Sequence, residues 1–244
     1  MATAAPDGHT ILVYGALATA HALHAKVPYD TLKDFAPVIP FGQQPLVLVT
    51  APSKGYKTLG DLVMAGKAKP GALNYSSAGI GSASHFGAER LRISAGFEAQ
   101  HIPFRGAAEA VTEVVSGRAD FSAQLATTTI SLINEGKLAA LAVSAQKRTA
   151  VMPQVPTMIE AGLPADSVYP FYTGMFVPAK TPRPIVERLH REAAQALQAP
   201  AVQAILAKLG VEAMPMTIEQ FGAFFREDVE AAVALVEAAK IPKQ

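Results

Sequence analysis

Hydroxyl side chains and glycines gather in one stretch of the chain, residues 74–85, which reads NYSSAGIGSASH. Gly79 and Gly81 allow the backbone to adopt positive φ and to approach a ligand closely. Ser82 or Ser84 can cap a following helix, whose first amides lack partners and attract anions. Two interpretations follow: residues 77–84, here called the Ser/Gly loop, cradle a carboxylate or phosphate, or they form a capped helix start that binds nothing.

A second junction between a predicted strand and a predicted helix lies at residues 104–107, which read FRGA. Arg105, beside Gly106 at the start of the helix, could present a bidentate guanidinium to a carboxylate. The alternative is an exposed loop arginine without a ligand, because surface arginines are common. We call residues 104–107 the Arg-Gly junction.

Sharper motifs for nucleotide binding or nucleophilic catalysis are incomplete. Ser84 stands where the dinucleotide fingerprint begun by Gly79 and Gly81 would need its third glycine. Residues 60–68 depart from a phosphate loop in their glycine spacing and end in alanine where a magnesium-binding hydroxyl belongs. The chain contains no Gly-x-Ser-x-Gly elbow for a serine nucleophile.

Composition restricts the class of protein further. With 21 basic against 20 acidic residues and no dense basic run, the chain lacks the charge pattern of a nucleic-acid or anionic-membrane binder. It contains no cysteine, so thiolate chemistry and disulfides are excluded. His21 and His24 have helical spacing, but no cysteine or nearby carboxylate completes a metal shell. We expect neither a metal nor a cofactor.

Hydrophobic patterning predicts alternating strands and helices. Strands are expected at 9–14, 45–50, 99–104 and 138–144, and helices at 59–68, 86–94, 107–117 and 127–134. This alternation favours a mainly parallel α/β sheet. A proline-rich segment from 148 to 170 then leads to an aromatic strand at 169–178.

Three further helices are expected near the C-terminus, at 182–198, 200–209 and 217–239. Thr181 is predicted to cap the first of them, Thr217 and Gln220 are expected to form a capping box for the last, and Thr58 is predicted to cap the earlier helix at 59–68. Its apolar stripe, Phe221, Phe225 and Val229, is predicted to be core.

Seven segments in register resemble one known family. They are APDGHTIL at 5–12, PYDTLKDFAP at 28–37, LNYSSAGIGS at 73–82, PFRG at 103–106, GKLAALAV at 136–143, VPTMIEAG at 155–162 and FVPAKTP at 176–182. Together they cover nearly the whole chain and resemble the tripartite tricarboxylate transporter receptors, the Bug-type extracytoplasmic solute-binding proteins.

The resemblance implies a two-lobed α/β receptor of the type II periplasmic-binding-protein fold, with two crossing strands near 45–50 and 171–178. Lobe 1 would comprise 1–46 and 171–244, and lobe 2 would comprise 47–170. A small organic acid would bind between the lobes, for delivery to the membrane components of a tripartite tricarboxylate-type transporter. The implied ligand set is Ser77, Ala78, Gly79, Gly81, Ser82, Ser84, Arg105, Gly106, Ala107 and Asp120.

Two departures from the family pattern matter. Ala107 and Glu109 stand where the family usually has a hydroxyl or other small residue and often a proline, so the junction offers fewer donors and gains a negative charge. Family members also carry a signal peptide and an initial strand-loop-helix-strand unit with a Pro-Gly-Gly loop. We expect this chain to begin after that unit, with a periplasmic location implied by the resemblance alone.

Two other functions remain open at this point. A hydrolase or transferase would need a convergent nucleophile and base, and Ser84, His85, His101 and Asp120 are the only candidates, without a motif spacing. The chain could also be a fragment that binds nothing because its true start lies upstream.

Overall fold

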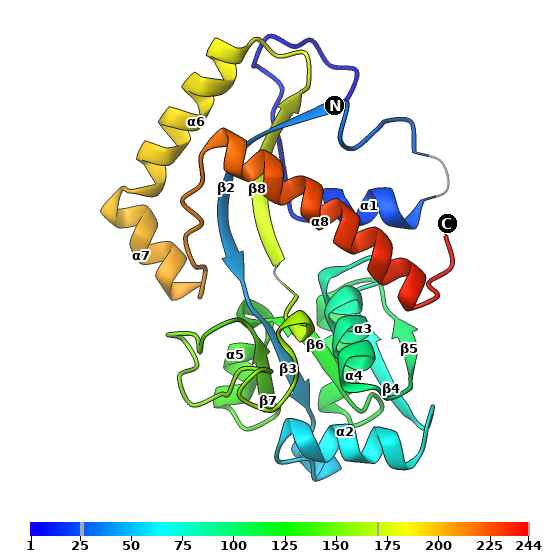
Figure 1. Cartoon of the computed structure of the whole chain (residues 1–244). Helices are drawn as coiled ribbons and strands as arrows, with labels where there is room; N and C mark the ends of the chain where they lie inside the picture. Colours follow the sequence, from blue (N-terminus) through cyan, green and yellow to red (C-terminus); the bar gives the residue numbers. More distant parts are fainter. Residues whose placement is uncertain (25–26, 170, 244) are drawn as a thin grey trace. The chain divides into compact units, whose positions relative to one another are not determined.

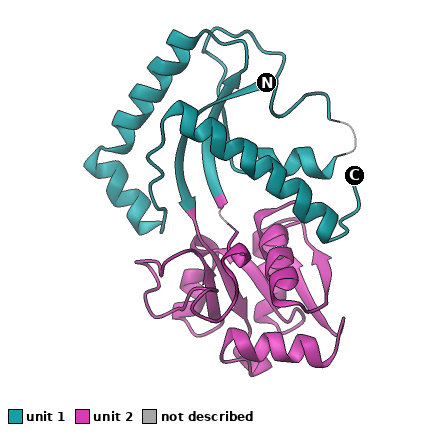
Figure 2. Cartoon of the chain, in the orientation of Figure 1, with its two compact units in different colours: residues 1–43, 172–244 teal, residues 44–171 magenta. Residues whose placement is uncertain are grey.

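The computed structural model describes residues 1–24, 27–169 and 171–243. The chain divides into two compact units: unit 1 contains Met1–Gln43 and Tyr172–Gln244, and unit 2 contains Gln44–Phe171 (Figure 2). The chain therefore enters unit 2 once and returns once. The lobe boundaries predicted from the sequence, 46/47 and 170/171, lie close to these divisions, although residue 170 itself is outside the described residues.

In the described residues, unit 1 is built on a three-stranded sheet in the order β1-β8-β2, and Figure 1 shows β2 and β8 side by side. Its strands are β1 (Leu12–Tyr14), β2 (Phe35–Gln44) and β8 (Phe171–Pro178), and its helices are α1 (Leu17–Leu23), α6 (Arg183–Leu197), α7 (Pro200–Lys208) and α8 (Ile218–Ala238). The stripe Phe221, Phe225 and Val229 of α8 is buried with Phe176 of β8, so its predicted core role is confirmed.

Strand β2 was missed in the sequence because Pro37 and Pro40 interrupt its apolar pattern. Proline cannot donate to a ladder, but β2 is an edge strand of its sheet, where proline is tolerated. The first strand is shorter than expected, because the side chain of Asp7 accepts the His9 N–H at 2.9 Å and holds a turn there. Strand β1 begins only at Leu12.

Two of the three caps predicted at threonines are confirmed. Thr58 forms a capping box at the start of α2 (Leu59–Ala68), and Thr217 forms one with Gln220 at the start of α8. The third is wrong: Pro182, not Thr181, occupies the N-cap position of α6, and no side chain caps that helix. The Thr181 hydroxyl is buried and has no hydrogen-bond partner among the described residues.

The described part of unit 2 contains five strands, and a helix precedes each of the last four. The elements are β3 (Leu46–Thr50), η1 (Pro52–Lys54), α2, β4 (Leu73–Ser77), α3 (Ala83–Ala95), β5 (Ala99–Pro103), α4 (Ala107–Val115), β6 (Ser122–Leu125), α5 (Ala126–Asn134), β7 (Ala139–Ser144) and η2 (Ala165–Ser167). Val47 and Val49 of β3 pack with Val111 and Val114 of α4 in the core of this unit.

The predicted mainly parallel sheet is wrong for β3. Strands β4 and β5 are parallel, and Tyr75 of β4 bridges in parallel to Phe121 just before β6. Strand β3, however, lies antiparallel between β6 and β7. Its direction has a simple cause, since β3 follows β2 with only Pro45 between them and does not return from a helix as the other strands do.

Candidate ligand-binding site

The Ser/Gly loop and the Arg-Gly junction meet at the carboxyl ends of two neighbouring strands. Ser77 of β4 is in register with Pro103 of β5, and the Phe104 N–H donates to the Ser77 carbonyl at 2.9 Å. Gly79 and Gly81 have φ of 120° and 81°, so the predicted positive φ is confirmed at both. Ligands of α/β proteins bind beyond such carboxyl ends, which makes this edge of unit 2 the candidate site.

The serine hydroxyls hold the Ser/Gly loop together. Ser82 caps α3 by accepting the His85 N–H at 3.3 Å, and its own hydroxyl donates to the Gly79 carbonyl at 2.7 Å. Ser84 Oγ accepts the Ala78 N–H at 2.9 Å and lies 3.0 Å from Ser82 Oγ. A hydroxyl has one hydrogen, so the hydrogens of both serines are used inside the loop. In the first turn of α3, Ser82 occupies the amide of His85, whereas the amides of Ala83 and Ser84 have no acceptor within the helix.

Helix α4 presents a less protected start at the Arg-Gly junction. Gly106 is its N-cap residue and no side chain caps the helix. The first-turn amides that begin at Ala107 have no acceptor within the helix and can bind an anion. The carboxylate of Glu109 already accepts the Arg105 N–H at 3.2 Å, so this acid lies at the same junction and opposes a second negative charge there.

Asp120 does not belong to this site. Its carboxylate binds Lys54 Nζ at 2.6 Å and the Asn74 N–H at 2.8 Å. Asn74 lies near the amino end of β4, whereas the Ser/Gly loop follows the carboxyl end, beginning at Ser77. The inclusion of Asp120 in the ligand set is corrected: a partly buried ion pair and a backbone bond occupy the carboxylate away from the loop.

Two histidines that the sequence offered only as possible catalytic groups lie beneath the loop. The rings of His85 and His101 stack with centroids 3.9 Å apart. His101 Nε2 is 2.6 Å from Ser77 Oγ, and His85 Nδ1 accepts the Gly81 N–H at 3.2 Å. Burial lowers the pKa of His85 to about 3 and that of His101 to about 4, so both rings are neutral near pH 7.

The histidine and serine contacts do not form a hydrolytic site. Among the described residues, no carboxylate is hydrogen-bonded to either ring, so the third member that orients a catalytic imidazole is missing there. Within the same residues no group of three or more metal-ligating side chains could hold an ion. No helix in the described ranges is long and apolar enough to cross a membrane.

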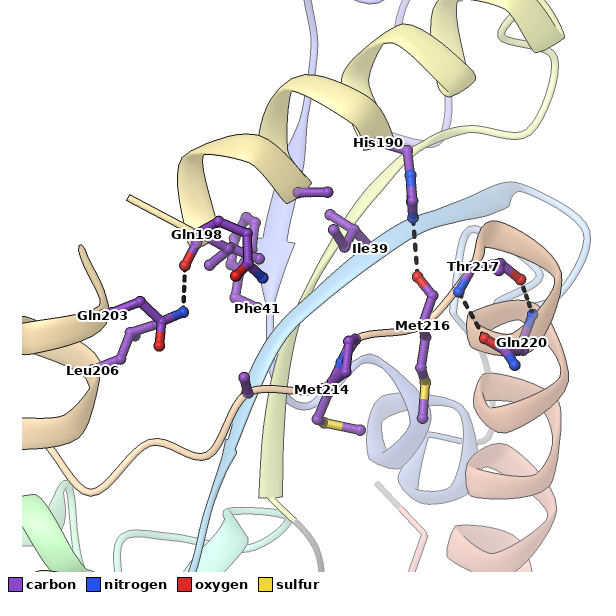
Figure 3. A pocket seen from close by; sticks show the side chains of 14 residues that line it. Ile39, Phe41, His190, Gln198, Gln203, Leu206, Met214, Met216, Thr217 and Gln220 are labelled. Atoms are coloured by element: carbon purple, nitrogen blue, oxygen red, sulfur yellow. Dashed lines mark hydrogen bonds between the residues drawn. The ribbon is translucent and has the colours of Figure 1, made fainter. Parts of the chain in front are cut away.

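Unit 1 contains a different cavity, of about 310 Å³, between β2, α6, α7 and the segment that leads into α8 (Figure 3). Ile39, Leu206 and Met214 contribute apolar surface, and His190 Nε2 lies 2.9 Å from the Met216 carbonyl. None of the described residues that line it is a lysine or arginine. The described lining of this cavity therefore offers a carboxylate no lysine or arginine side chain.

Solved structures with the same fold define the class of protein. The periplasmic binding protein BugD superposes with a TM-score of 0.85 at 28% identity, over 100% of this chain and 82% of BugD. MatC from Rhodopseudomonas palustris, solved with bound malate, gives a TM-score of 0.83 at 30% identity, over 96% of this chain and 81% of MatC. The fold is that of the periplasmic binding proteins, which are receptors and not enzymes.

The family follows from the sequence match. Residues 1–241 match the family described as tripartite tricarboxylate transporter family receptor, and the chain belongs to it. A curated relative, the UPF0065 protein in the tcbD-tcbE intergenic region of Pseudomonas sp. strain P51, is 34% identical over 232 residues, 94% of this chain and 69% of the relative. The resemblance drawn from the seven sequence segments is thus confirmed.

Proposed function

We propose that this receptor captures a small mono- or dicarboxylate at the Ser/Gly loop and the Arg-Gly junction of unit 2. The observation that carries the proposal is the meeting of two helix starts, those of α3 and α4, at loops joined by the Phe104 to Ser77 hydrogen bond. The proposed ligand-binding residues are Ser77, Ala78, Gly79, Gly81, Ser82, Ser84, Arg105, Gly106 and Ala107. The malate bound to MatC, a protein of the same fold, supports this class of ligand.

The electrostatics of the two loops favour an anion. Each helix start supplies amide donors and the positive end of a dipole, while the side chain of Arg105 can add a charge-assisted, bidentate contact. The formal net charge of the chain is only +1, so attraction of the ligand must be local and not a property of the whole surface. Glu109 would favour a ligand whose second polar group lies away from the start of α4.

We further propose a periplasmic location and delivery of the acid to the membrane components of a tripartite tricarboxylate-type transporter. Both are proposed on the basis of family membership. The support is the resemblance to periplasmic receptors such as BugD.

A ligand screen by melting temperature tests the proposal. A ligand that binds only the native state stabilises it by about 2.7 kcal/mol at a hundred times its Kd. Malate, succinate, adipate and citrate would be compared with glucose and the diamine putrescine, and calorimetry would confirm each shift. A rise in melting temperature with a carboxylate is expected; stabilisation by the sugar or the amino cation alone would exclude a carboxylate receptor.

A further inference from the structure

Three aromatic rings form a continuous stack under the Ser/Gly loop. The ring centroids of Tyr75 and His101 are 4.9 Å apart with planes 15° from parallel, and those of His101 and His85 are 3.9 Å apart with planes 9° from parallel. Tyr75 and His85 are buried, with 0% and 2% of their surfaces exposed. The stack fixes the positions of the imidazole nitrogens that face the loop.

Each imidazole makes its contact to the loop through one nitrogen. His85 Nδ1 accepts the Gly81 N–H at 3.2 Å, so it carries no hydrogen. His101 Nε2 lies 2.6 Å from Ser77 Oγ, which itself accepts the Gly79 N–H at 3.2 Å. The two histidines are thus connected, directly or through one hydroxyl, to both positive-φ glycines of the loop.

Burial keeps both rings neutral. It lowers the pKa of His85, and His101 of β5 and Arg92 of the same helix as His85 lower that pKa further. Burial likewise lowers the pKa of His101, and only Glu89 opposes this. Glu89 is itself bonded to the Tyr75 hydroxyl and paired with Arg92 at 2.6 Å, which weakens its pull on a proton. Neutral rings preserve the acceptor nitrogen that the Gly81 N–H requires.

We propose that His85 and His101 are positioning residues that hold the Ser/Gly loop in the conformation that binds the solute. They act through Gly81 and Ser77 and do not contact the ligand. The inference rests on the proposed function, since it assigns the loop to carboxylate binding. A preordered loop raises affinity because less backbone has to be ordered when the ligand arrives.

Paired substitutions separate positioning from bulk packing. In His85→Leu the ring is replaced by a residue without an acceptor, whereas His85→Asn retains an amide oxygen within reach of the Nδ1 position. Hydrogen exchange of the Gly81 amide, followed by NMR in the unliganded protein, reports on the loop, and calorimetry with malate reports on binding. A matched control, His190→Leu, alters a histidine of unit 1 that is bonded to a backbone carbonyl.

We expect His85→Leu to speed exchange of the Gly81 amide about 3- to 10-fold and to weaken malate binding by a similar factor, as loss of one hydrogen bond implies. His85→Asn should restore most of both, and His190→Leu should change neither. Rescue by asparagine distinguishes a positioning role from a general loss of stability.

Three results would overturn the inference. One is unchanged Gly81 exchange in His85→Leu; another is faster exchange with unchanged malate affinity. The third comes from the wild-type protein and needs no variant to fold: an imidazole ¹⁵N spectrum that places the hydrogen on His85 Nδ1. If the wild type binds no carboxylate, the proposed function fails, but the exchange and tautomer measurements still decide whether the histidines order the loop.

Discussion

Replacing Ser84 by alanine tests whether the serines build the loop. Ser84 is 4% exposed, and its Oγ accepts the Ala78 N–H at 2.9 Å and lies 3.0 Å from Ser82 Oγ. A buried donor that loses its acceptor costs about 1–3 kcal/mol. Ala78 is only half-buried, so water can reach its amide, and we expect the lower part of that range, about 1–2 kcal/mol.

The free energy of unfolding lost in Ser84→Ala also sets the largest effect that this substitution can have on binding. If the loop is disordered in the free variant, the ligand has to order it on binding. The binding free energy then weakens by at most the roughly 1–2 kcal/mol lost from the loop, which corresponds to about a 5- to 30-fold loss of affinity. Urea unfolding would give the free energy of unfolding, and calorimetry with malate would give the affinity. Ser116→Ala is the matched control, because Ser116 is exposed at the end of α4 and its hydroxyl bonds the Glu113 carbonyl of the same helix.

The control should change stability by less than about 0.5 kcal/mol and leave binding unchanged. If Ser84→Ala behaves like Ser116→Ala in both assays, the hydroxyl does not hold the loop. If stability falls but affinity does not, the loop is ordered by Ser84 but does not bind the acid.

Three other predictions follow from the same contacts. Arg105→Ala should weaken malate binding less than Ser84→Ala does, since a loop arginine must be immobilised to bind; a larger loss by calorimetry would reverse this ranking. Asp120→Ala should lower the free energy of unfolding by about 2–4 kcal/mol without altering affinity, because it leaves a partly buried lysine unpaired away from the loop. The pKa values of His85 and His101 are lowered to about 3 and 4 from an ordinary 6.5, so as the pH falls the unfolded chain takes up protons at these rings before the folded chain does. The contribution of the two neutral rings to the free energy of unfolding should therefore be complete above about pH 6.5. Between there and pH 4 the free energy of unfolding should fall by at most about 1.4 kcal/mol per pH unit for each ring. Urea unfolding at several pH values should show a smaller slope in the double variant His85→Asn, His101→Gln.

Features that depend on a few neighbouring residues were predictable from the sequence. The capping boxes of Thr58 and Thr217 and the positive φ of Gly79 and Gly81 are local choices, because the interacting atoms are at most a few residues apart. The same holds for the α8 stripe that begins at Phe221, since helical periodicity alone gives one buried face. Motif order along the chain was enough to identify the family.

Features that depend on long-range packing were not predictable in this way. The prolines of β2 obscured a strand that only its edge position in the sheet permits. The antiparallel direction of β3 depends on where the chain enters unit 2, and the hydrophobic pattern of a strand carries no information on its direction. Asp120 was grouped with the ligand set because its partner Lys54, 66 residues away, could not be assigned without the fold.

The candidate site shows most clearly which features the sequence determines and which depend on the tertiary structure. The sequence by itself predicted that Ser82 or Ser84 would cap a helix after a glycine turn, because a cap and its amide lie within one turn of helix, and the cap is Ser82. Only the tertiary structure brought the Phe104 N–H to the Ser77 carbonyl and placed His101, 24 residues along the chain, against the Ser77 hydroxyl. Those contacts depend on the parallel pairing of β4 with β5, and that pairing is fixed by the packing of the whole unit, not by any residue near the loop.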